Sequence, residues 1–115
     1  MTSGKTLEQK IADIQMLEHN LQQLLIEKQN IQIELNEVSQ ALEEVKKTAG
    51  EIYKVLSSIM ILADKKVVST DLEERKKMLE LRMKSMEKQE SLVGEKIQAL
   101  RGEINASVAQ KKSRA

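Results

Sequence analysis

The chain has 115 residues, a net charge of +1, 40% hydrophobic residues and a single aromatic side chain, Tyr53. This composition favours long helices over an aromatic-rich globular core, and its charge balance provides no field that would attract nucleic acid or an anionic membrane. The lack of cysteine excludes disulfides, thiolate zinc sites and thiol nucleophiles. Since the sequence shows no signal-peptide core and no apolar run of roughly 18 residues, we expect a cytoplasmic protein with no nucleic-acid or membrane partner.

The first predicted element is a helix over about residues 6–47, which contains neither proline nor glycine after Thr6. Its apolar residues recur with a seven-residue period in two adjacent series, one from Leu7 to Leu42 and one from Leu17 to Val45. Such a repeat is typical of a coiled coil. Lys28 interrupts the first series, so we expect the middle of the seam to be looser than its ends.

Residues 51–63 break the helical pattern and predict a β-hairpin. Gly50 is expected to end the first helix, and two short apolar strands, 52–56 and 59–63, follow on either side of Ser57-Ser58. A lone two-stranded hairpin is marginal in water, and its second strand is apolar on both faces, so we expect other chains to cover it. The residues assigned to this assembly surface are Ile52, Tyr53, Val55, Leu56, Ile59, Met60, Ile61 and Leu62. A continuous helix through this segment is the alternative.

A second helix is predicted over about residues 66–110, followed by a basic tail at 111–115. Its apolar residues again repeat every seven positions. Two start signals compete, a cap by Asp64 and a capping box formed by Thr70 with Glu73, and both remain open.

Folding the chain back at Ser57-Ser58 brings the two apolar stripes face to face, with Lys28 opposite Met86. The predicted fold class is therefore mainly α: a long antiparallel two-helix coiled coil with a short β-hairpin between the helices, forming one unit over residues 1–115. The carboxylates are spread along helix faces, His19 is the only histidine, and no phosphate-binding glycine loop is present. We therefore predict no catalytic residues, no metal site, no cofactor and no enzymatic activity.

This arrangement resembles the beta-type subunits of prefoldin, in particular the archaeal form. The resemblance is carried by IYK in the first strand, IMILADK in the second and LEERKKMLELRMKSMEKQE after it, and it covers about residues 7–104. It implies a hexamer of two alpha-type and four beta-type subunits, in which the hairpins form a β-barrel platform. It also implies an ATP-independent holdase, which captures unfolded polypeptides at its coiled-coil tips and transfers them to a group II chaperonin. The family usually has glycine where this chain has Ser57-Ser58.

The helix ends remote from the hairpin would then be the client-binding tips. The residues expected there are Leu7, Ile11, Ile14, Met16, Leu17, Leu100, Ile104 and Val108. The alternative is that they only pack against each other in the seam, although Met16 lies off the seam, as do Ile26, Ile33, Met78, Leu81 and Leu92. Gly94 and Gly102 are expected to soften this half of the second helix. The competing function is a structural coiled-coil spacer or adaptor in another complex.

Overall fold

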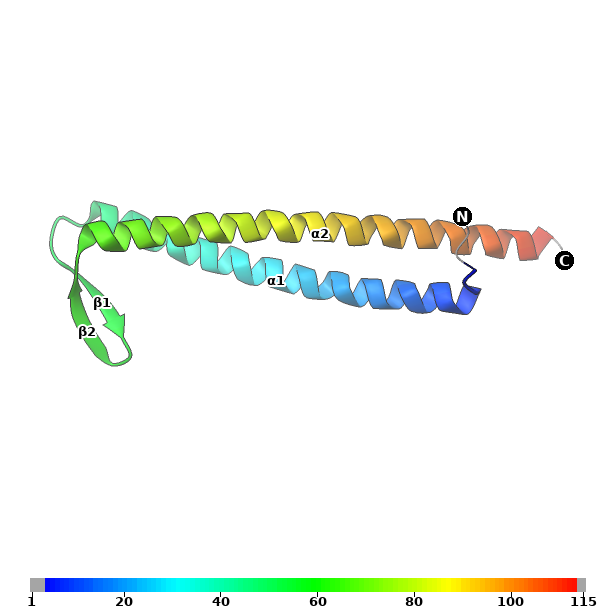
Figure 1. The fold of residues 1–115 in the computed structure, drawn as a ribbon, viewed down its shortest axis with the longest axis horizontal. Coiled ribbons are helices and arrows are strands. Elements are labelled where there is room, and N and C mark those ends of the chain that lie inside the picture. Colours follow the sequence, from blue (N-terminus) through cyan, green and yellow to red (C-terminus); the bar gives the residue numbers. More distant parts are fainter. Residues whose placement is uncertain (1–3, 114–115) are drawn as a thin grey trace. The chain divides into compact units, whose positions relative to one another are not determined.

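The protein is described by a computed structural model that covers residues 4–113, with side chains through Gln110. The chain folds into α1 (Leu7–Lys47), β1 (Ile52–Leu56), β2 (Ile59–Ala63) and α2 (Lys65–Ser113), as Figure 1 shows. The predicted fold class, two long helices joined by a short antiparallel β-hairpin, is confirmed. The side chains of the basic tail predicted at 111–115 lie outside the described residues.

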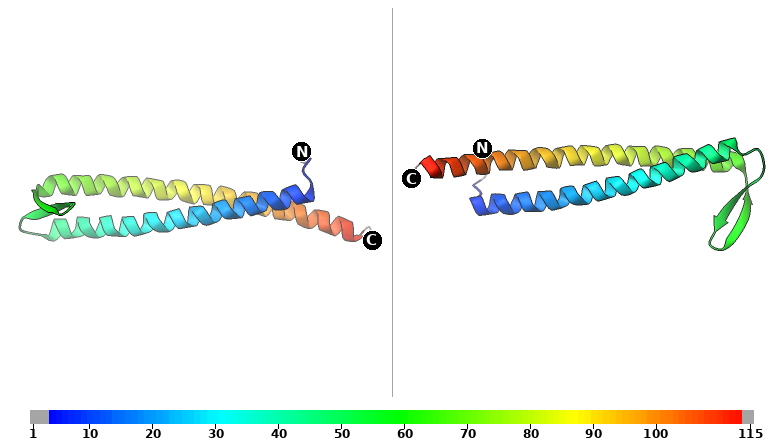
Figure 2. Two further views of the ribbon diagram at one scale, coloured as in Figure 1. Left: turned by 90° about the horizontal axis from the view of Figure 1, so that it is seen from below. Right: turned by 180° about the vertical axis from the view of Figure 1, so that it is seen from behind.

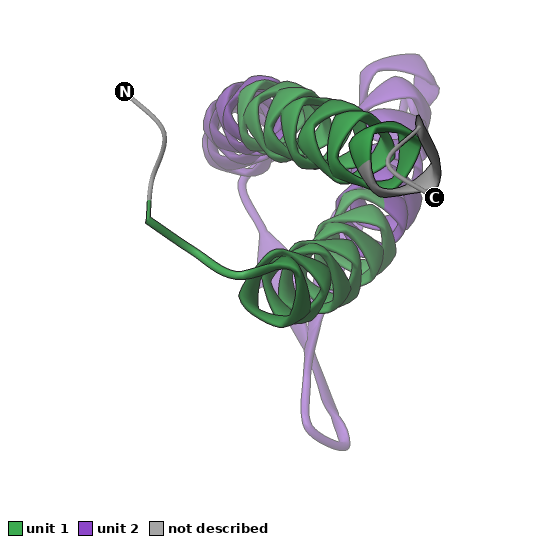
Figure 3. Cartoon of the chain, turned by 90° about the vertical axis from the view of Figure 1, so that its right-hand side faces the viewer, with its two compact units in different colours: residues 1–28, 86–115 green, residues 29–85 purple. Residues whose placement is uncertain are grey.

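The chain divides into two compact units (Figure 3). One comprises residues 1–28 and 86–115 and is called the terminal unit here; the other comprises residues 29–85 and is called the hairpin unit. Within each unit a segment of α1 lies antiparallel beside a segment of α2, and in the hairpin unit the two strands extend away from the helix pair (Figure 2).

The buried core of each unit is a seam between its paired helix segments. The members of both seams all come from the predicted heptad stripes: Ile14, Ile31, Val38, Leu42, Leu79, Met86 and Ile97. Among residues 4–110 no side chain falls below 2% exposure, because a seam residue in a two-helix pair has only one partner helix to cover it.

A capping box begins α1. The amide of Gln9 donates to Thr6 Oγ1 (3.2 Å), and the amide of Thr6 donates to Gln9 Oε1 (3.0 Å). Two backbone donors at the helix start are therefore satisfied reciprocally.

The end of α1 differs from the prediction that Gly50 closes it. The helix ends at Lys47, and Gly50 does not have the positive φ of a helix-terminating glycine. Instead, Thr48 Oγ1 donates to the carbonyl of Glu44 (2.7 Å), and the ammonium group of Lys65 donates to the carbonyl of Thr48. The prediction was wrong because hydrogen bonds from Thr48 and Lys65 complete this helix end without a glycine in the left-handed conformation.

Asp64 settles where α2 begins. Its Oδ1 accepts from the amide of Lys66 (2.8 Å) and from that of Val67 (3.4 Å), as an N-cap carboxylate does. Thr70, the competing start, lies inside the helix, where its hydroxyl donates to the carbonyl of Lys66 (3.0 Å).

The hairpin has the predicted strands and a turn at Ser57-Ser58. Its register pairs Ile52 with Ala63 and Leu56 with Ile59. Ser57 has φ 59° and is the only non-glycine residue with positive φ among residues 4–113. Positive φ at the first central residue alone is the pattern of a type II′ turn, which normally places glycine there.

Ion pairs between the helices agree with the predicted register. In the terminal unit they are Lys10–Glu103 (3.9 Å), Glu18–Arg101 (3.0 Å) and Lys28–Glu90 (2.8 Å), and in the hairpin unit Glu34–Arg75 and Lys46–Glu73 (3.3 Å). Exposed pairs each contribute at most about 1 kcal/mol, so the seam supplies most of the stability. Lys28, predicted to lie opposite Met86, extends its ammonium group to Glu90, one helical turn further along α2, because pairing avoids burying an uncompensated charge.

Candidate functional site

The first candidate site is the hairpin surface. One face carries Tyr53, Val55, Met60 and Leu62, which are 53–66% exposed and include no charge. On the other face Leu56, Ile59 and Ile61 are also exposed, with Lys54 as the single charged residue and Ile52 half-buried. Apolar side chains exposed on both faces of two strands form a contiguous patch of the kind that marks an interaction site.

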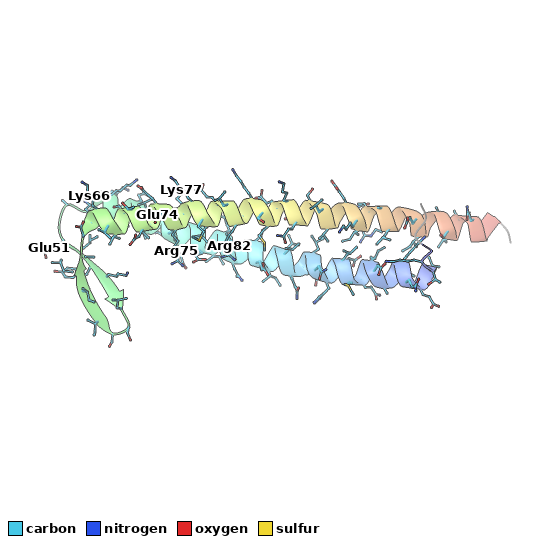
Figure 4. All side chains as sticks on the ribbon, in the orientation of Figure 1. Glu51, Lys66, Glu74, Arg75, Lys77 and Arg82 are labelled. Carbon is cyan, nitrogen blue, oxygen red and sulfur yellow. The ribbon has the colours of Figure 1, made fainter. Side chains whose placement is uncertain are left out.

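A groove of about 760 Å³ lies beside this hairpin, within the hairpin unit. Tyr53 and Lys54 line it from β1, and Met78, exposed at 63%, lines it from α2. The charged side chains of Glu74, Arg75 and Arg82 on α2 also line it (Figure 4). The groove therefore extends the apolar hairpin surface onto a helix face of mixed charge.

The predicted tip residues fall into three groups in the terminal unit. Ile11, Met16 and Val108 are exposed, at 41%, 66% and 39%. Leu7, Leu17, Leu100 and Ile104 are half-buried. Ile14 is buried in the seam, so it can touch a client only if the helices separate.

The side chains predicted to lie off the seam are all exposed. Their exposed fractions range from 52% to 67%, for Met16, Ile26, Ile33, Met78, Leu81 and Leu92. A two-helix surface facing only water would carry polar residues at such positions. Met16 and Leu92 belong to the terminal unit, where they lie beside its surface grooves.

Two stretches of groove run between α1 and α2 in the terminal unit. One, of about 430 Å³, includes Met16, Leu17 and Leu100; the other, of about 350 Å³, includes Leu24, Leu92 and Val93. Both stretches include Lys96, so they adjoin there. We call their combined surface the terminal groove.

Sequence reasoning missed the polar rim of the terminal groove. On α1 the rim contains Asp13, Asn20 and Glu27, and on α2 it contains Gln89, Lys96 and Glu103. Each set repeats every seven residues. That period was the signal available in the sequence, but positions outside an apolar stripe are usually solvated surface.

Lys28 has a half-buried ammonium group on α1 that pairs with a carboxylate on α2. Its hydrogen bond to Glu90 Oε2 (2.8 Å) raises the pKa of the ammonium group, and the charges of Glu90 and Glu87 add to this effect against the opposing effect of desolvation. The interaction stabilises the charged form of Lys28 within the seam.

Within residues 4–110, no group of three His, Cys, Asp or Glu side chains is placed to hold a metal ion. Neither of the two helices, as far as the structure describes them, is long and apolar enough to span a membrane.

Comparisons with known proteins agree with the fold. A family model described as "Prefoldin subunit" matches residues 8–111. The structure is similar to the crystal structure of the prefoldin beta subunit from Thermococcus strain KS-1, with a TM-score of 0.82 and 24% identity over 93% of this chain and 96% of that one. The comparison with curated proteins gives no match. The resemblance expected from the hairpin and the heptads is thus confirmed at the level of fold.

Proposed function

The chain belongs to the prefoldin subunit family, and we propose that it is a beta-type subunit of an ATP-independent chaperone. Family membership itself indicates a chaperone-type role and assembly with other prefoldin subunits. The proposal adds a cytoplasmic hexamer with alpha-type partners, capture of unfolded polypeptides by the terminal unit, and transfer of these clients to a group II chaperonin.

The main observation in support of the proposal is that the apolar side chains of the hairpin are exposed. Burying one aliphatic side chain contributes roughly 1.5 to 3 kcal/mol, and Val55, Met60 and Leu62 are each more than half exposed. Neighbouring hairpins would cover these side chains and pair the free strand edges. This supports assembly through a shared sheet.

Client capture is supported by the exposed apolar side chains of the terminal unit. Met16 and Leu92 are 66% and 55% exposed, and unfolded polypeptides expose apolar side chains that can be buried against them. Several weak apolar contacts of this kind form and break without a chemical step, which suits a holdase that must release its client.

The test combines assembly with chaperone activity. Mixed with an alpha-type subunit, the chain is expected to give a hexamer by native mass spectrometry and to delay aggregation of a denatured client without ATP. A structural spacer would assemble without delaying aggregation, and a chain that stays monomeric in the mixture would refute the proposal.

A hairpin variant makes the test specific. Val55→Asp places a charge on the uncharged hairpin face and is expected to reduce hexamer formation at least tenfold, because the carboxylate would be desolvated in the shared sheet. Lys77→Glu, an exposed change on α2 in the same unit, is the matched control and should assemble normally. Equal assembly of both variants would rule out the hairpin as the interface.

A further inference from the structure

Apolar side chains repeat every seven residues along the terminal groove, and this spacing favours a helical ligand over an extended one. Its apolar floor contains Leu17 and Leu24 on α1, and Val93 and Leu100 on α2, each pair seven residues apart. Seven helical residues span about 10.5 Å. Side chains on one face of an extended strand recur at about 6.8 Å, so a strand would not match this floor. A helix with apolar residues at i and i+7 has the same 10.5 Å repeat.

The length of the groove also suits a helix. On α1 it extends from Asp13 to Glu27, which corresponds to about 21 Å along the helix axis. A ligand helix of about 14 residues, or four turns, has this length. Met16 and Leu92, exposed at 66% and 55%, flank the floor and would contact the sides of its apolar face.

The charges on the rim identify the polar residue that such a helix should carry. Near one end of the groove Asp13 already pairs with Lys5 (2.5 Å), and Glu103 pairs with Lys10 (3.9 Å). Lys96 lies where the two stretches adjoin, and it forms no ion pair with any side chain of residues 4–110. A carboxylate at the edge of the ligand's apolar face would complement this ammonium group.

We propose that the terminal groove binds an amphipathic helical segment of a client polypeptide, with an acidic residue of that segment placed against Lys96. This inference rests on the proposed function, since it specifies what the chaperone recognises. Unfolded chains retain fluctuating helices with apolar faces. The groove selects such segments by the spacing of their apolar residues, and Lys96 selects their charge.

The test uses the full chain and two labelled helical peptides of about 18 residues, a length that exceeds the groove. The peptides share one apolar face with i, i+3, i+4, i+7 spacing and differ only in a Glu or a Lys at its central edge. By fluorescence anisotropy at low salt, the wild type should bind the Glu peptide about threefold more tightly. Lys96→Glu should reverse this preference. The control Lys88→Glu makes the same charge change on α2 outside the groove and should keep the wild-type preference.

Equal affinities in the wild type, or an unchanged preference in Lys96→Glu, would overturn the proposal. Tighter binding of a peptide with the same composition but an alternating pattern would overturn it as well. If Lys96→Glu instead dissociates a complex of copies in native mass spectrometry, the groove is an interface between copies and the proposal is wrong.

Aggregation of a denatured client, measured in parallel with the chain mixed with an alpha-type subunit, separates this inference from the proposed function. If aggregation is delayed but the peptides bind equally well, the proposed ligand of the groove is wrong and the proposed chaperone function stands. Absence of both removes both conclusions.

Discussion

Replacing the two glycines of α2 in the terminal unit should stiffen that unit. Gly94 and Gly102 have no positive φ, and a Cβ added to either meets no heavy atom within 4 Å apart from its chain neighbours and the adjacent backbone of α2. Alanine therefore fits without a clash, and each substitution should stabilise the helix by up to about 1 kcal/mol. The sites lie about 12 Å apart along the axis, so their effects should add, to about 1.5–2 kcal/mol.

The double variant, Gly94→Ala with Gly102→Ala, can be measured by urea unfolding and by hydrogen exchange. A gain of 2 kcal/mol corresponds to about 30-fold less frequent opening of the amides around both sites. If clients reach buried side chains such as Ile14 through that opening, suppression of aggregation should weaken in parallel. Gly4→Ala is the matched control, since Gly4 precedes α1 and has the same free space around it.

Two results would refute this reasoning. Unchanged hydrogen exchange in the double variant would show that these glycines do not limit the stability of α2. Slower exchange with unchanged suppression of aggregation would show that clients use only side chains that are already exposed, such as Met16.

Three further predictions concern single side chains outside the groove. Ser57→Gly should stabilise the hairpin by about 1 kcal/mol, because glycine adopts positive φ without steric cost. Slower hydrogen exchange of the hairpin amides would show the stabilisation, and Ser57→Ala is the control. Asp64→Ala should lower the free energy of unfolding by about 1 kcal/mol through loss of the N-cap, whereas Asp64→Asn should nearly preserve it in the same urea titration. Because Glu90 raises the pKa of folded Lys28, their interaction contributes stability below pH about 10.4 and loses it as the pH rises through the raised value. Between pH 9 and 11.5, the melting temperature of the Lys28→Met variant should therefore fall less than that of the wild type. Identical pH profiles of the two melting temperatures would contradict the role of this pair.

The features predicted correctly from the sequence are those set by apolar periodicity. Heptad spacing identified the seam, because burial between two helices favours apolar side chains at every seventh position. It also identified Met16 and Leu81 as exposed. The hairpin was equally readable, because β-rich residues on both sides of Ser57-Ser58 have no place in a coiled coil.

The features that were missed depend on side chains that meet only after folding. Gly50 was predicted to end α1, but the ammonium group of Lys65, distant in sequence, donates to the carbonyl of Thr48 just beyond the helix end. The pair of Lys28 with Glu90 and the rim around Lys96 likewise combine residues from both helices. Local secondary-structure propensity contains no information about contacts between residues that are distant in sequence.

The layered packing between the paired helices determines how their length can change during evolution. No described side chain is fully buried, so no single position dominates the stability of the paired helices, and each layer depends mainly on its immediate neighbours. An insertion of seven residues in each helix at matching levels would add one layer and leave the others intact. Evolution can therefore lengthen or shorten the helices in steps of one heptad while the hairpin keeps its sequence, a freedom that a globular core does not allow.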